Sequence, residues 1–97
     1  MWYSVCIRLK SKISSNTDYK PLIEDSVILI QADSDTMAEL EVEKVAKAKE
    51  HSYLNHLGEK VEWTLVSISQ IQDICSEEIK SGLEVYSVLT RDENALW

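Results

Sequence analysis

The chain has few of the residues that mark flexible linkers, phosphate-binding loops or disulfide frameworks. Its 97 residues include only two glycines, Gly58 and Gly82, and one proline, Pro21, which leaves little room for linkers or disorder. A Gly-rich phosphate loop is therefore excluded, and no G-x-S-x-G motif or Cys/His pair suits nucleophilic catalysis. The two cysteines, Cys6 and Cys75, are too few and too far apart for a disulfide framework. We expect both to be buried free thiols.

Basic residues and long apolar runs are also scarce. The 10 Lys and Arg residues are outnumbered by 17 Asp and Glu, which gives a net charge of −7 at pH 7. Nucleic-acid backbones and anionic membranes attract clustered Lys and Arg, so neither is an expected partner. No apolar run approaches the ~18 residues of a membrane span, and the chain opens on a strand-like segment without signal-peptide features. These observations predict a cytoplasmic protein.

The first third of the chain predicts two strands in a single domain over residues 1–97. Residues 2–10 alternate between apolar and polar, as a half-buried strand does. Residues 11–25 are mostly polar and are expected to form a long loop. Residues 26–32 contain an apolar run at 27–30 that does not alternate. Such a run indicates a strand covered on both faces, in the interior of a sheet.

A long helix is predicted to follow. The residues D-S-D-T at 33–36 can accept hydrogen bonds from the free amides of a first turn, and Ser34 is the favoured N-cap. Thr36 and Glu39 are an alternative capping box. The helix is expected to run to about residue 54, because an apolar stripe continues at helical spacing through Ala38, Val42, Val45, Ala46 and Tyr53.

The rest of the chain completes an α+β pattern. Residues 60–69 predict a third strand with either a bulge or cover on both faces. Residues 71–79 have apolar positions at helical spacing, residues 83–90 predict a fourth strand, and residues 91–97 a tail. The order β-β-α-β-α-β predicts a four-stranded, mostly antiparallel sheet with one long helix on one face and a short second helix.

The chain resembles a family of small, mostly bacterial proteins classed as a domain of unknown function. The resemblance covers nearly the whole length and depends on short groups of residues: Met1-Trp2-Tyr3-Ser4, Pro21-Leu22 leading into residues 26–30, then Glu50, Tyr53 and Asn55, Gly58 with Val61 and Trp63, and Gly82 with Glu84-Val85-Tyr86-Ser87. It implies no established activity and no catalytic residues.

Several motifs are weighed as metal or catalytic sites. The D-x-D of Asp33 and Asp35 can hold a divalent cation, but capping of the helix explains both acids. His51 and His56 are five residues apart, roughly 140° around a helix, which does not suit a shared metal. Glu84 is expected on the same strand face as Tyr86, where a carboxylate and a phenol could exchange protons. No base partner or cleft accompanies them. We therefore predict no catalytic residue, no metal and no cofactor.

Two kinds of function remain. The predicted strands carry apolar residues on both faces, more than one long helix can cover, and soluble proteins rarely leave such patches bare. We therefore expect a non-enzymatic interaction module that self-associates as a homodimer. Candidate interface residues are Trp2, Val66, Ile68 and Val88, and Trp97 is either interface or tail. The alternatives are a small-ligand or anion sensor, with Lys49, Tyr53 and Glu84 as ligand-binding residues, or an acidic immunity-type protein that binds a basic partner.

Overall fold

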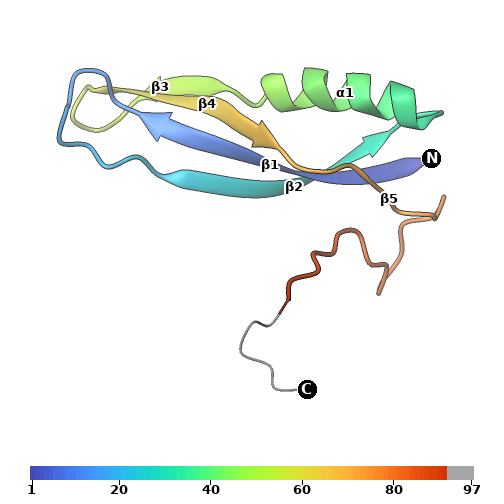
Figure 1. The fold of residues 1–97 in the computed structure, drawn as a ribbon. Helices are drawn as coiled ribbons and strands as arrows, with labels where there is room; N and C mark the ends of the chain where they lie inside the picture. The colour runs from blue at the N-terminus through green and yellow to red at the C-terminus, as the bar shows by residue number, and fades with distance from the viewer. Residues whose placement is uncertain (92–97) are drawn as a thin grey trace.

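The computed structural model describes residues 1–91, which form an antiparallel sheet with one α-helix on one face (Figure 1). The elements in chain order are β1 (Trp2–Lys12), β2 (Ile23–Gln31), α1 (Asp35–Lys47), β3 (His51–Leu54), β4 (Lys60–Ile68) and β5 (Gln72–Asp73). The strand order is β2-β1-β4-β3, and the short β5 also pairs with β1. The predicted mixed fold, with an antiparallel sheet and a single long helix, is confirmed.

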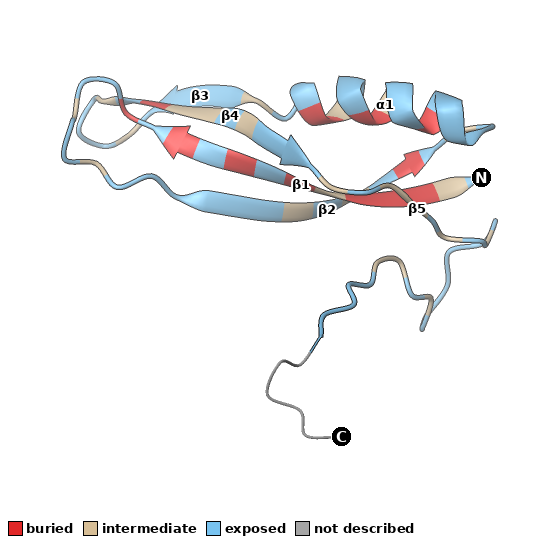
Figure 2. Ribbon diagram, in the orientation of Figure 1, coloured by how far each residue is buried: buried red, intermediate tan, exposed pale blue. Residues whose placement is uncertain are grey.

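Strand β1 is the centre of the sheet, and its alternating side chains set the position of the core. Tyr3, Val5, Ile7 and Leu9 are all buried, each no more than 3% exposed. They lie on the face that α1 covers, and Figure 2 shows the resulting alternation of buried and exposed residues along β1. The hydrophobic core is therefore a single layer between the sheet and the helix, to which β1 contributes most and β2 adds Ile30.

Helix α1 begins as the sequence predicts. The Oγ atom of Ser34 accepts a hydrogen bond from the backbone N–H of Met37 at 3.2 Å, which satisfies one free amide of the first turn. Its buried stripe consists of Ala38, Val42 and Ala46. Because two of these three side chains are methyl groups, the helix backbone can approach the sheet closely.

The helix ends earlier than the prediction of about residue 54. It stops at Lys47, and Tyr53, expected on its apolar stripe, lies instead in β3. Glu50 explains the change of direction, because its carboxylate accepts the backbone N–H of Leu65 at 2.8 Å and an ion pair from Lys47 at 2.9 Å. These contacts lower the pKa of Glu50, the Leu65 hydrogen bond most strongly. Residues 51–54 then pair with β4.

The turn between β3 and β4 is organised by Asn55. Its side-chain oxygen accepts the backbone N–H groups of Leu57 at 2.9 Å and Glu59 at 3.0 Å. Gly58 closes the turn with φ of +75°, a conformation that side chains with a Cβ atom disfavour. Asn55 and Gly58, two of the residues behind the family resemblance, therefore have a structural role.

We expect Gly58→Ala to lower the free energy of unfolding by about 1–2 kcal/mol, because a Cβ atom is strained in the left-handed region. No other atom lies within 4 Å of the position a Cβ would take, so backbone strain is the only penalty. Gly58→Asn is the matched control and should retain most of the stability, since Asn tolerates this region. Urea denaturation measures both. Equal losses for the two variants, or none for Ala, would contradict this explanation.

The C-terminal part of the described chain departs most from the prediction. The expected short helix over residues 71–79 is wrong: residues 72–73 form β5, and the rest of that stretch has no helix. Pairing of Tyr3 with Asp73 and of Ser4 with Gln72 gives the start of β1 a neighbour where β4 has ended. The expected fourth strand over residues 83–90 is also not a strand. The predicted tail, including Trp97, lies outside the described residues except for Arg91.

The remaining differences concern edges and loops. The register between β1 and β4 shifts between Arg8 and Leu9, which confirms a bulge in β4 and leaves Val66 as its extra residue. The loop predicted over residues 11–25 is shorter, because β1 extends to Lys12 and β2 begins at Ile23.

Both cysteines are free, but only Cys6 is partly buried and Cys75 is exposed. The prediction of two buried thiols is therefore wrong for Cys75.

Candidate functional site

The face of the sheet opposite the helix is only partly covered, near the start of β1, where Ser4 is fully buried. The register of β1 and β2 places four cross-strand pairs there: Ser4 with Leu29, Cys6 with Val27, Arg8 with Asp25, and Lys10 with Ile23. We call these eight residues the open face. The residues that alternate with them along each strand point to the other face of the sheet, toward the helix.

Apolar side chains on the open face come from β2. Ile23, Val27 and Leu29 are 51%, 47% and 39% exposed. The apolar run of residues 27–30 predicts an interior strand, and this prediction is wrong for the single chain, because β2 is the edge of the sheet. Only Ile30 of this run is buried. β2 thus has the composition of an interior strand in an edge position.

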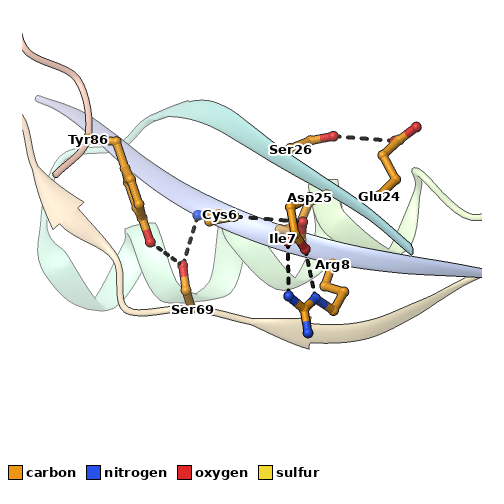
Figure 3. A network of polar contacts seen from close by, with 8 residues as sticks. All are labelled: Cys6, Ile7, Arg8, Glu24, Asp25, Ser26, Ser69 and Tyr86. Atoms are coloured by element: carbon orange, nitrogen blue, oxygen red, sulfur yellow. Dashed lines mark hydrogen bonds and ion pairs between the residues drawn. The ribbon is translucent and has the colours of Figure 1, made fainter. Parts of the chain in front are cut away.

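One ion pair crosses the open face. The guanidinium of Arg8 donates to both carboxylate oxygens of Asp25, at 2.7 and 2.9 Å (Figure 3). The hydrogen bond from Arg8 is the main cause that lowers the pKa of Asp25. Both side chains are about half exposed, so the pair contributes little to stability. Its main effect is to neutralise the acid on this face.

The segment of residues 83–90 lies against the open face near the start of β1, and we call it the C-terminal segment. The Ser4 hydroxyl donates to the backbone carbonyl of Val85. Gln72 binds Ser87 twice: its amide NH₂ donates to the Ser87 carbonyl at 2.8 Å, and its side-chain oxygen accepts the Ser87 N–H at 3.2 Å. The side-chain amide of Gln72 therefore binds the Ser87 backbone as the backbone of a neighbouring strand would, with one donor and one acceptor.

A second polar chain joins the C-terminal segment to the sheet. The Ser69 hydroxyl lies 3.0 Å from the Tyr86 hydroxyl and accepts the backbone N–H of Cys6 at 2.9 Å (Figure 3). Tyr86 and Val85 are half-buried here. The proton exchange considered for Glu84 and Tyr86 was not favoured by the sequence, and no hydrogen bond joins the pair here: the Tyr86 hydroxyl contacts Ser69, and Glu84 is exposed.

The four predicted interface residues come from three parts of the chain. Trp2 is half-buried in β1 opposite Gln31. Val66 and Ile68 lie in the part of β4 that extends beyond its pairing with β3, and they are 52% and 36% exposed. Val88 is exposed in the C-terminal segment and lines a surface hollow with Ser69 and Gln70. None of the predicted interface residues lies in β2, although the apolar run of β2 is a sequence signal for an interface.

The three predicted ligand-binding residues are also separate. Lys49 follows the helix and is exposed, Tyr53 is in β3, and Glu84 is in the C-terminal segment. Glu84 lines a cavity of about 250 Å³ that neither of the other two lines. The described geometry therefore gives no shared pocket for this set.

An aromatic cluster on β3 and β4 was not predicted. The imidazole of His51 stacks on Tyr53 at a centroid distance of 6.0 Å and on Trp63 at 6.3 Å. Trp63 Nε1 donates to the Tyr53 hydroxyl at 3.4 Å. Because His51 and Tyr53 are two residues apart, a strand would have placed them on one face. The predicted helix extends through this stretch, so the shared strand face of the two residues was not predicted.

Of the two acids at the helix start, Asp35 binds Tyr3. The Tyr3 hydroxyl donates to Asp35 at 2.9 Å, beside a cavity of about 170 Å³ that Glu39, Ile71 and Asp73 also line. Burial, followed by the hydrogen bond and charge of Asp35, raises the pKa of Tyr3 to about 12. Among residues 1–91, no group of three or more His, Cys, Asp and Glu side chains could hold a metal ion.

These features define a small α+β domain whose sheet is covered by a helix on one face only. The sequence model of the family described as a domain of unknown function, DUF4288, matches residues 2–87. The chain therefore belongs to this family, as its residues had suggested. No curated protein and no solved structure matches the chain. In the described part of the chain, no helix has the length and apolar character needed to cross a membrane.

Proposed function

We propose that this protein is a non-enzymatic interaction module that self-associates through its sheet as a homodimer. The observation that carries the proposal is the exposure of Ile23, Val27 and Leu29 on the open face of an edge strand. Fully burying such a side chain contributes roughly 1.5–3 kcal/mol, so covering the exposed half contributes about 1 kcal/mol each. A second copy supplies a surface of the same composition.

Size-exclusion chromatography with light scattering tests the proposal. At tens of micromolar protein we expect twice the chain mass of 11.1 kDa. Leu29→Lys should shift the protein toward monomer, because it places a charge on the open face. Leu40→Lys is the matched control, since Leu40 is 60% exposed on the helix, away from the sheet. A monomeric wild-type protein, or dissociation by Leu40→Lys alone, would contradict self-association through the sheet.

A further inference from the structure

The outer edge of β2 is an uninterrupted row of main-chain groups. The Ala32 N–H donates to the Met1 carbonyl, and the Ser11 N–H donates to the Leu22 carbonyl, both at 3.0 Å. Hydrogen-bonded residues alternate along an antiparallel ladder, so residues 24, 26, 28 and 30 pair with β1. The N–H and C=O groups of residues 23, 25, 27, 29 and 31 point outward. In the described chain no backbone hydrogen bond reaches them from another segment.

At the other end of the sheet, the free edge is formed by β3 and by the part of β4 beyond it, and this edge is protected against pairing with another strand. The edge of β2 is therefore the better candidate for such pairing. Beyond its pairing with β3, β4 has a bulge at Val66 and its Leu65 N–H is capped by Glu50. Bulges and charged side chains are devices that prevent edge-to-edge pairing. β3 has only four residues. β2 offers nine residues without a bulge, a proline or a lysine; its two acids, Glu24 and Asp25, lie near one end, and Asp25 is paired with Arg8.

We propose that two copies of this chain pair antiparallel along their β2 edges, with Val27 of each copy opposite Leu29 of the other. The pairing rests on the proposed self-association and adds the edge and the register. It places β2 in the interior of a continuous sheet that runs through both copies. On the open face, the half-exposed Val27 and Leu29 side chains of the two copies then lie side by side, so each gains an apolar cross-strand neighbour.

The register follows from charge and side-chain matching. Only outward-pointing residues can form the hydrogen-bonded pairs, so alternative registers differ by two-residue steps. A register with Asp25 opposite itself opposes like charges and is disfavoured. The register with Val27 opposite itself places Asp25 opposite Leu29. With Val27 opposite Leu29, the apolar residues face each other and Asp25 faces the amide of Gln31.

Disulfide trapping tests the pairing. In a background with Cys6→Ser and Cys75→Ser, one copy with a mass tag has Val27→Cys and the untagged copy has Leu29→Cys. Cα atoms of directly opposed strand residues lie about 5.5 Å apart, within disulfide range. We expect mixed oxidation to link tagged to untagged copies in high yield. Each variant alone should give little product, because diagonal neighbours are farther apart.

The outcomes separate this register from self-association in general. Cross-links mainly in the Val27→Cys or Leu29→Cys sample alone would overturn the register. A light-scattering dimer without β2 cross-links would overturn the edge pairing while the proposed function stands, and a monomer would remove both. Leu40→Cys is the control that should not cross-link. Independently of any substitution, the amide hydrogens of residues 25, 27, 29 and 31 should exchange more slowly as protein concentration rises. Unchanged exchange in a dimer would also contradict the proposal.

Discussion

Tyr3→Ala is expected to lower the free energy of unfolding by about 3–5 kcal/mol, the range for removing a buried aromatic ring. The Tyr3 side chain is 2% exposed in the core between β1 and the helix, and its hydroxyl donates to Asp35. A small domain has roughly 0.05–0.15 kcal/mol of stability per residue, so this loss is a large fraction of the total stability of the chain. Urea denaturation at fixed protein concentration measures the loss, because dimerisation makes stability depend on concentration.

The same substitution at an exposed tyrosine provides the control. Tyr53 is 48% exposed in β3 and contacts only the aromatic cluster of His51 and Trp63 among the aromatic rings described. Tyr53→Ala should lower stability by no more than about 1 kcal/mol, the scale of an exposed cross-strand pair. Comparable losses at both positions would show that the core does not centre on Tyr3.

Rising pH is expected to destabilise the protein between about pH 10 and pH 12 through Tyr3. The pKa of this phenol is raised from 10.0 to about 12 in the folded protein. Below pH 10 both the folded and unfolded states hold the proton, so the contribution of Tyr3 is fully present. Between the two pKa values the unfolded chain releases the proton while the folded chain keeps it, so stability falls as pH rises.

The comparison with Tyr3→Phe isolates this contribution from the other tyrosines and lysines. Phe keeps the ring in the core but has no ionisable hydroxyl, so this variant should lose less stability between pH 10 and pH 12 than the wild type. Thermal denaturation across this range, monitored by circular dichroism, gives both profiles. Parallel profiles would show that the Tyr3 phenol titrates in the folded state as it does in the unfolded chain.

Most of the residues that carry the family resemblance have structural roles, and none of them is placed in a catalytic site. Asn55 and Gly58 build the β3–β4 turn, and Glu50 holds the N–H of Leu65 at the end of the helix. Near the C-terminus, Val85 and Tyr86 attach their segment to Ser4 and Ser69. This use of the shared residues agrees with a module that presents a surface, which is the function we propose.

Local patterns were enough to predict much of the fold. The period-two alternation of residues 2–10 places Tyr3, Val5 and Ile7 in the core, because successive strand residues point to opposite faces. The Ser34 cap marks the helix start, since its side chain binds the first-turn amides directly. These features depend on residues within a few positions of one another. The ligand-binding candidates Lys49, Tyr53 and Glu84 were each chosen by residue type, and they lie in three different segments.

The core strand, the capped helix start and the acidic, cysteine-poor character of this protein can all be read from local spacing or composition. Three features emerge only in the folded chain: Tyr53 belongs to a strand, residues 72–73 pair with β1, and β2 lies at an edge. Residues 51–54 pair with the neighbouring β4 and residues 72–73 pair with the distant β1, so backbone hydrogen bonding overrides the local helical patterns. In the described chain β2 is an edge because no segment pairs with its outer side. Such long-range pairings place the open face on this molecule.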